Sequence, residues 1–394
     1  MRTIGVVTVA RSDYGIYVPL LRLLQQDPEL RLALFVTGMH LSPEFGRTVE
    51  QIERDGFEIA SRIEMLVSSD TPEAIAKSTG LGVIGFAQAF ATLRPDILVV
   101  LGDRFEMVAA ALAALPFKIP VAHIHGGEVT FGAIDEALRH SITKLSHLHF
   151  VSTERYGARV AQLGEQPWRI TVSGAPGLDS VGTIKLMTRA EIEAQWGLRI
   201  TDAPLLITFH PVTLEYEQTE WHITELLAAL HEIDRPVIFT MPNADTTGRL
   251  IIGAIEKFVA SNTNAQAVDN LGTRGYFSLM SMAAAMVGNS SSGIIEAASF
   301  GLPVVNIGTR QGGRESARNV IDCGYGRAEI RAAIERAISS DFRRGLEGLT
   351  NPYGRGDASQ RIADRLKAVE LNQELIVKKF NDIEAPNAHA PFSS

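Results

Sequence analysis

Residues 98–139 read LVVLGDRFEMVAAALAALPFKIPVAHIHGGEVTFGAIDEALR, and this stretch decides the fold. Two apolar runs, at residues 98–101 and 119–122, each stop abruptly at charged or ionisable residues. Apolar runs of this length are typical of strands buried on both faces of a parallel sheet. In such sheets, ligands bind beyond the carboxyl ends of the strands. We therefore expect an α/β fold with a functional site at this edge.

The same alternation of apolar strands and helices extends along the chain and restarts after a crossing segment at residues 176–201. This pattern predicts two doubly wound parallel sheets in two domains, 1–176 and 177–357. We expect a final helix near 358–378 to pack back on the first domain, and a tail at 381–394, rich in Ala, Pro, Asn and Ser, to be disordered. The expected strands cover residues 4–9, 32–36, 57–63, 98–101, 119–122, 148–152, 170–173, 205–209, 236–240, 265–269, 286–287 and 303–307.

The composition excludes several classes of protein. A net charge of −8 argues against a general nucleic-acid-binding surface, so an anionic ligand would have to be met locally by arginines, histidines and helix N-termini. A single cysteine, Cys323, excludes an intrachain disulfide framework and any cysteine-cluster metal site. No stretch approaches the roughly 18 apolar residues of a membrane span. We therefore expect a soluble, cytoplasmic protein without a membrane partner.

Three carboxylates in the opening stretch are candidate acid–base groups. Asp103 directly follows the first apolar run, where it could act on a ligand or cap a helix over residues 105–112. Asp135 opens a later helix and is spaced i,i+4 from Arg139, which suits either a site or a surface ion pair. Glu128 closes the run HIHGGE. Each residue therefore keeps a structural interpretation beside the functional one.

The run HIHGGE, residues 123–128, carries the strongest competing chemistry. Strand alternation predicts that His123 and His125 lie on one face, and two histidines with a carboxylate could bind zinc. The opposing interpretation is that at least one histidine is a satisfied polar group behind the site. Gly126 and Gly127 predict a close approach of the backbone to a ligand or to a helix.

In the second half, two sequence features point to an anion. His210 ends a strand before Pro211, where a structural role and a phosphate-binding or catalytic role are both open. The run GNSSSG, 288–293, opens a helix, and its hydroxyls and free N–H groups suit a diphosphate, although a serine there can simply cap the helix. Glu296 lies one turn further on. Neither a Walker sequence nor G-x-G-x-x-G follows the first strand, so an NTPase and a Rossmann dehydrogenase are not supported.

Taken together, these motifs resemble the hydrolysing UDP-N-acetylglucosamine 2-epimerases. The resemblance covers about residues 3 to 370 in collinear order. The matching runs are ARSDYG (10–15), VTGMHLS (36–42), GDRFEM (102–107), HIHGGE, IDEALRHSITKLSHLHF (134–150), FHP (209–211), NAD (243–245), GNSSSGIIE (288–296), NIGTRQGGR (306–314) and NPYG (351–354).

The resemblance implies a GT-B-like fold, with two Rossmann-like domains and the UDP-sugar bound in an interdomain cleft. It implies conversion of UDP-N-acetylglucosamine to N-acetylmannosamine and UDP: C2 loses its proton, UDP leaves to give a 2-acetamidoglucal, and water adds. A sister branch acts on UDP-N,N′-diacetylbacillosamine, and a GT-B glycosyltransferase is a less favoured alternative. No metal or nicotinamide cofactor is implied, and a homo-oligomer, dimer or tetramer, is expected.

Carried over by motif, the catalytic candidates are Asp103, Glu128, Asp135, His210 and His125. The substrate-binding candidates for the UDP-sugar are Arg11, Asn243, Arg274, Ser290, Ser291, Ser292, Gly293, Glu296 and Arg314. One departure concerns the acid–base groups, because much of the wider family has a glutamate where His125 stands. The resemblance leaves open whether His125 or Glu128 does the work of that glutamate.

Overall fold

The structure, a computed structural model, describes residues 1–43, 47–67, 71–129, 134–242 and 246–382. It divides into two compact units. Unit 1 comprises Met1–Glu128, Asp135–Pro176 and Asp357–Ser394, and unit 2 comprises Val129–Ile134 and Gly177–Gly356. In the described part of the chain, no helix is both long and apolar enough to cross a membrane.

Unit 1 is built on a seven-stranded sheet with the order β3-β2-β1-β4-β5-β6-β7, in which every pair of neighbours is parallel. The order reverses direction between β1 and β4, so a topological switch point lies there. The strands are β1 (Arg2–Thr8), β2 (Leu30–Thr37), β3 (Ile59–Ile63), β4 (Ile97–Leu101), β5 (Val121–Ile124), β6 (Leu148–Val151) and β7 (Ile170–Val172).

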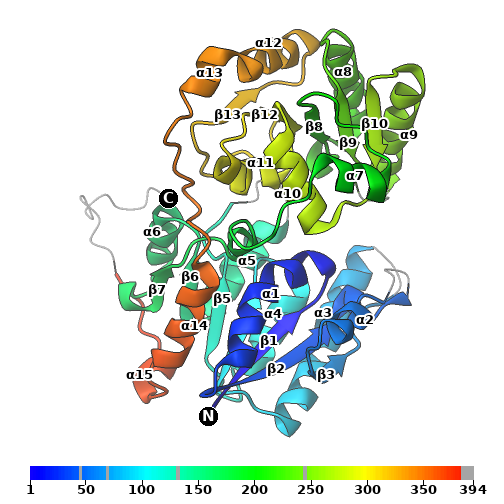
Figure 1. Cartoon of the computed structure of the whole chain (residues 1–394). Helices are drawn as coiled ribbons and strands as arrows, with labels where there is room; N and C mark the ends of the chain where they lie inside the picture. The colour runs from blue at the N-terminus through cyan, green and yellow to red at the C-terminus, as the bar shows by residue number, and fades with distance from the viewer. Residues whose placement is uncertain (44–46, 68–70, 130–133, 243–245, 383–394) are drawn as a thin grey trace, which may run out of the picture. The chain divides into compact units, whose positions relative to one another are not determined.

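Helices on both faces of this sheet bury its apolar strands, as Figure 1 shows. They are α1 (Arg11–Gln26), α2 (Val49–Arg54), α3 (Pro72–Thr92), α4 (Phe105–Ala114), α5 (Ile134–Leu145), α6 (Glu154–Gln162), α14 (Ala358–Ala368) and α15 (Gln373–Ile376), with short 3-10 turns at Gly38–His40 and Pro167–Arg169. The end of the chain returns to this unit, because Ile362 and Leu366 of α14 are buried in the same core as Tyr17 and Leu20 of α1. Residues 383–394 of the expected disordered tail lie outside the described residues.

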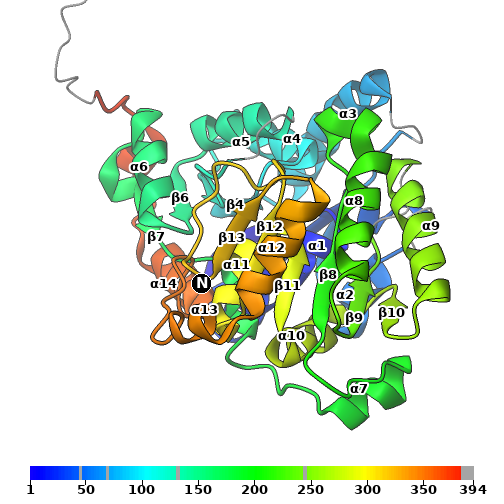
Figure 2. The same cartoon turned by 90° about the horizontal axis from the view of Figure 1, so that it is seen from above.

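Unit 2 holds a six-stranded parallel sheet with the order β10-β9-β8-β11-β12-β13 and a switch point between β8 and β11. Helices α8 and α12 pack side by side, and α12 lies over β11, β12 and β13 (Figure 2). The strands are β8 (Leu205–Thr208), β9 (Val237–Thr240), β10 (Ala265–Val268), β11 (Ala285–Gly288), β12 (Val304–Ile307) and β13 (Val320–Cys323).

The remaining elements of unit 2 are α7 (Arg189–Trp196), α8 (Thr219–His231), α9 (Thr246–Ser261), α10 (Gly272–Met282), α11 (Ser291–Ile295), α12 (Arg327–Ile338) and α13 (Ser340–Arg344), with 3-10 turns at Pro176–Ser180, Thr213–Gln218 and Ala297–Phe300. The two predicted parallel sheets are confirmed, but the sequence did not predict β13. That edge strand carries only one fully apolar pair, Val320 and Ile321, before Asp322. The helix that the serine run was expected to open is short, because α11 ends at Ile295 and a 3-10 helix at Ala297–Phe300 follows Glu296.

Candidate active site

Asp103 lies beyond the carboxyl end of β4, where it pairs with an arginine. Helix α4 takes Arg104 as its N-cap and has no side-chain capping bond, so the capping role considered for Asp103 is wrong. The carboxylate instead forms an ion pair with Arg139, whose Nη1 also donates to the backbone oxygen of His125 at 3.0 Å. Arg139 is almost completely buried, whereas the Asp103 side chain is 24% exposed. The pair thus fixes a carboxylate whose outer side is open to a ligand.

Asp135 stands in the first turn of α5, close to the Asp103–Arg139 pair. Burial, and then the negative charge of Asp103, raise the pKa of Asp135 against the opposing effects of Arg139 and Arg104. Arg139 is buried and pairs with Asp103, which follows β4. The interpretation of Asp135 and Arg139 as only a surface ion pair is therefore wrong. Two neighbouring carboxylates with different surroundings are suited to different proton-transfer roles.

The two histidines of HIHGGE have different environments, so the prediction that they share one face is wrong. Strand β5 ends at Ile124, and His125 adopts a left-handed backbone conformation with φ of 65°. His125 Nδ1 lies 2.5 Å from Glu128 Oε1, and that oxygen also accepts from the Ser152 hydroxyl at 2.7 Å. Glu128 therefore orients the imidazole of His125.

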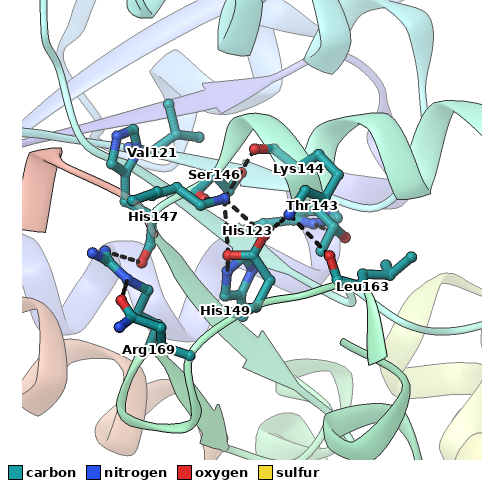
Figure 3. Close-up of polar contacts among 12 residues, drawn as sticks. Val121, His123, Thr143, Lys144, Ser146, His147, His149, Leu163 and Arg169 are labelled. Atoms are coloured by element: carbon teal, nitrogen blue, oxygen red, sulfur yellow. Dashed lines mark hydrogen bonds and ion pairs between the residues drawn. The ribbon is translucent and has the colours of Figure 1, made fainter. Parts of the chain in front are cut away.

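His123 is enclosed within the unit, behind the site. Its Nε2 donates to the Gly102 carbonyl at 2.7 Å, and its Nδ1 lies 3.2 Å from the Thr143 hydroxyl, which Figure 3 shows beside it. Complete burial lowers the pKa of His123 to about 3, so the ring is neutral at pH 7. Because both ring nitrogens have partners, His123 is a satisfied structural group and not a zinc ligand. Among the residues that the structure describes, no cluster of His, Cys, Asp and Glu has the arrangement of a metal site.

The second glycine of HIHGGE is required by a helix. Gly127 has φ of 75°, and a Cβ there would lie 2.5 Å from the backbone oxygen of Tyr156 in α6. The close approach predicted from the glycine pair is therefore to α6. This contact turns the chain immediately after His125 and holds Glu128 behind its ring.

Several buried polar residues near this edge were missed by the sequence analysis. Asp13, in the first turn of α1, accepts from the hydroxyl of Thr8 at 2.7 Å and from the N–H groups of Val9 and Ala10. Glu106 is completely buried and pairs with Arg104 at 2.8 Å. The motifs ARSDYG and GDRFEM contain both acids, but only the fold shows that they are buried. Arg11, beside Asp13, is exposed on α1.

Asp13→Asn should change how stability depends on pH. Burial raises the pKa of Asp13 to about 6 from 3.8, outweighing its hydrogen bonds. The folded protein therefore holds this proton more tightly than the unfolded chain, and that stabilisation is lost as pH rises from about 4 through 6. Asparagine keeps the accepting oxygen but removes the titration. The melting temperature of the variant minus that of the wild type should increase between about pH 4 and 7, while Asp364→Asn, an exposed control, shows no trend. A constant difference would contradict this prediction.

An ionic group at the C-terminal end of α5, the Glu165 cluster, comprises Glu165, His149, Lys144 and Lys378. The carboxylate of Glu165 is fully buried and accepts from His149 at 2.9 Å, from Lys144 at 2.7 Å and from Lys378 at 2.8 Å. Burial acts to raise the pKa of Glu165, but these hydrogen bonds overcome it and lower the pKa to about 2. Figure 3 shows the side chains of Lys144 and His149 in this part of unit 1.

The Glu165 cluster also fastens the end of the chain to α5. Lys378 donates to the backbone oxygens of Lys144 and Ser146, at the C-terminal end of that helix. Arg169 donates to the carbonyls of Glu374 and Leu375 in α15 and to that of His147. Asp135 lies in the first turn of α5 and Arg139 near its middle, so the tail holds the helix that presents them.

In unit 2, Asn289 fixes the backbone at His210. The N–H of His210 donates to Asn289 Oδ1 at 2.7 Å, and Asn289 Nδ2 donates back to the His210 carbonyl at 2.8 Å. Asn289 is completely buried, and its own carbonyl accepts from Arg310 and Gln311. Burial, and then the charge of Arg310, lower the pKa of His210 to about 4. The loops after β8, β11 and β12 therefore meet at a neutral imidazole.

The serine run follows β11 at the same sheet edge. Gly288 has φ of 138°, and a Cβ there would lie 2.0 Å from the Thr208 carbonyl, so only glycine permits this approach of β11 to β8. Ser290 caps α11 by accepting from the N–H of Ser292 at 3.3 Å. The capping interpretation of Ser290 is thus correct. The N-terminal turn of the short helix α11 follows β11 directly, and its Gly293 packs against Val304.

A tyrosine beneath the serine run was also missed. Tyr276 of α10 hydrogen-bonds Thr208 at 3.2 Å. Burial raises the pKa of Tyr276 to about 12, and nearby Ser292 and Glu296 also act on its hydroxyl. Tyr276 lies 14 positions before Ser290, and no sequence pattern at that spacing would have identified it as part of the site.

Three other predicted substrate-binding residues have different placements. Arg314 is half-buried. Burial, and then the nearby positive charge of Arg314, lower the pKa of Arg310. Arg274 is exposed, donates to the Lys185 carbonyl at 2.8 Å and lies 3.7 Å from Glu191, so these contacts do not join it to the serine run. Asn243 lies outside the described residues.

Two parallel sheets flanked by helices, each with polar residues at its carboxyl edge, define a GT-B-like α/β protein. The chain belongs to the UDP-N-acetylglucosamine 2-epimerase family, whose model matches residues 22–367. The resemblance found in the motifs is thereby confirmed.

Relatives and solved structures agree with this membership. The chain is 39% identical to the GDP/UDP-N,N′-diacetylbacillosamine 2-epimerase (hydrolyzing) of Campylobacter jejuni, covering 87% of this chain and 89% of that protein. It is 36% identical to the UDP-N,N′-diacetylbacillosamine 2-epimerase (hydrolyzing) of Legionella pneumophila, covering 96% and 99%. The crystal structure of UDP-GlcNAc 2-epimerase from Neisseria meningitidis bound to UDP-GlcNAc matches with a TM-score of 0.80 and 21% identity, covering 93% of this chain and 99% of that one.

Proposed function

We propose that this chain is a hydrolysing 2-epimerase that converts a UDP-2-acetamido sugar and water to UDP and the free C2 epimer. The observation that carries the proposal is the group of acid–base residues at the carboxyl edge of the unit 1 sheet, Asp103, Asp135 and the His125–Glu128 pair. Proton removal from C2 needs a placed base because that proton is only weakly acidic. An edge with two neighbouring carboxylates and an oriented imidazole supplies both bases and acids.

The geometry suggests how these groups divide the work. Asp103, held by Arg139, is assigned to take the C2 proton as UDP leaves C1 by anti elimination, giving a 2-acetamidoglucal. Asp135, whose pKa is raised, is suited to return a proton to C2 when water adds at C1. His125 takes the place of the glutamate of other members, with Glu128 behind it, because His125 is the more exposed of the two at 10% against 4%.

Unit 2 is proposed to hold UDP. The serine run, residues 290–292, supplies hydroxyls and a helix N-terminus, and Arg310 and Arg314 supply positive charge near His210. Glu296 is assigned to the ribose hydroxyls. Neutral His210 can donate one hydrogen bond to the diphosphate without the cost of burying a cation.

The preferred sugar is proposed to be N,N′-diacetylbacillosamine. Two relatives at 39% and 36% identity carry that substrate in their names, whereas the UDP-N-acetylglucosamine 2-epimerase of Neisseria meningitidis is 32% identical. UDP-N-acetylglucosamine, with N-acetylmannosamine as product, is the second candidate.

Incubation with each UDP-sugar in D₂O, without any acceptor, tests the proposal. Release of UDP together with a free C2-epimeric sugar deuterated at C2, observed by NMR, is the expected result. Deuterium enters because the second step returns a proton from solvent to C2. Release of UDP with the C2 configuration retained, or turnover only after an acceptor is added, would refute epimerisation and favour a glycosyltransferase.

UDP should raise the pKa of His210. In the free protein this pKa is lowered to about 4, and a bound diphosphate would place negative charge beside the imidazole and favour its protonated form. An NMR titration of ring proton shifts, assigned with His210→Gln, should show the His210 midpoint moving upward by at least about one pH unit when UDP is saturating. The buried His123 serves as an internal control whose shifts should stay constant. An unchanged His210 midpoint would place the diphosphate elsewhere.

A further inference from the structure

Unit 1 contains a cavity of about 1080 Å³ that the proposed reaction steps do not use. Its walls come from the segments that follow β2, β3 and β4 and from the N-terminal part of α3. Pockets for small molecules usually enclose about 300–1,000 Å³, so the cavity is large enough for part of a sugar nucleotide. Its position at the carboxyl ends of parallel strands is where ligands of such sheets bind.

The wall of this cavity has an apolar part and a polar part. Its apolar side chains include Met39, Leu41, Met65, Leu66, Ile75 and Phe105. Its polar side chains are Ser42, Arg47, Arg62, Glu64, Ser78 and Arg104, which can hydrogen-bond an amide group. Methyl groups gain free energy by leaving water for the apolar part of the wall. A wall of this mixed kind suits an acetamido group, which carries both an amide and a methyl.

Arg104 joins the cavity to the acid–base residues. It lines the cavity, and its guanidinium is held by Glu106 and lies 3.7 Å from the sulfur of Met39. It directly follows Asp103 in sequence, and its charge acts on Asp135. The cavity therefore extends from the segment after β4, which also carries Asp103, toward the segments after β2 and β3.

We propose that this cavity is a specificity pocket for the acylamino and methyl substituents that the sugar carries on C4 and C6, away from the reacting C1–C2 bond. The inference rests on the proposed function, which places C2 at Asp103. A 2,4-diacetamido-2,4,6-trideoxy sugar has an acetamido group at C4 and a methyl group at C6. N-acetylglucosamine has hydroxyl-bearing groups at both positions, and these lack the methyl groups that the apolar part of the wall would bury.

Ile75→Phe, which partly fills the cavity, tests the pocket against Ile84→Phe as a matched control. Both residues belong to α3, but Ile84 is 58% exposed and does not line the cavity. Steady-state kinetics with UDP-N,N′-diacetylbacillosamine and UDP-N-acetylglucosamine give the ratio of the two kcat/KM values. We expect Ile75→Phe to lower this ratio about tenfold or more, since misplacing one or two methyl-sized groups has effects of this order. Ile84→Phe should leave it unchanged.

Leu66→Gln provides a second variant from a different wall, in case Ile75→Phe does not fold. It should lower the same ratio by placing an amide against the methyl groups. The affinity for UDP alone, measured by calorimetry, should not change in either variant. An equal loss with both substrates, or a wild-type preference for UDP-N-acetylglucosamine, would overturn the pocket while leaving 2-epimerisation intact. Failure of the wild type to release UDP from either substrate would instead refute the proposed function.

Discussion

Replacing Asp103 with asparagine should lower kcat about 10³-fold while UDP-sugar binding survives. A placed base or acid contributes about 10² to 10⁴ to the rate, and asparagine cannot accept a proton. The side chains are nearly the same size, so the amide oxygen can still accept from Arg139 and the site should stay assembled. The assay is UDP release under saturating substrate, with binding measured by calorimetry on the same variant.

Asp364→Asn provides the matched control for this experiment. Asp364 is exposed on α14 and accepts a local hydrogen bond from Gln360, so the same substitution there should leave kcat unchanged. Raised KM with unchanged kcat in Asp103→Asn would show that Asp103 binds substrate without taking part in proton transfer. Unchanged kcat and KM would remove it from the mechanism altogether.

Glu165→Gln should destabilise the folded protein by about 3 kcal/mol. Removing one partner from a buried ion pair leaves an uncompensated buried charge, which typically costs about 3–5 kcal/mol. Here the orphaned charge belongs mainly to Lys378, whose side chain is only 18% exposed, since Lys144 is more open to water. Urea unfolding at pH 7, followed by circular dichroism, measures the loss. The exposed substitution Glu370→Gln should change the unfolding free energy by less than about 0.5 kcal/mol.

The pH dependence of this loss gives a further check. The pKa of Glu165 is lowered to about 2, so its stabilisation is complete above about pH 4.5 and disappears as pH falls toward 2. The difference between wild type and Glu165→Gln should therefore shrink on acidification. The double variant Glu165→Gln/Lys378→Met should regain part of the stability, because it removes the orphaned ammonium. If the double variant is no more stable than Glu165→Gln, the loss of stability does not come from the uncompensated charge of Lys378.

How much of the site could be predicted from sequence depends on whether the information is local. The strands β4 and β5 and the acids that follow them were predictable, because an apolar run ending in charged residues already places those side chains at a sheet edge. The capping role of Ser290 followed from similar local chemistry. The backbone turn at His125 was not predictable, since it depends on Gly127 meeting the carbonyl of Tyr156, 29 positions along the chain.

The partners of the charged groups also required the tertiary structure. From spacing alone, Arg139 would pair along its own helix, but the fold brings it to Asp103 across the sheet edge. Likewise, Asn289 and His210 are 79 positions apart and meet only because β8 and β11 are neighbours. The Glu165 cluster draws on residues from positions 144 to 378, and no sequence pattern joins them.

The sequence by itself determined that this is an α/β chain with two parallel sheets, that it belongs with the 2-epimerases, and which carboxylates stand at the sheet edge. These properties follow from periodicity and from the residues next to each strand, which act over a few positions. Only the tertiary structure decided that His123 is a buried, neutral support, that His125 and Glu128 form one pair, and that a partly apolar cavity adjoins Arg104. Burial and the meeting of distant segments set these properties, because desolvation and hydrogen-bond partners exist only once the sheets have formed.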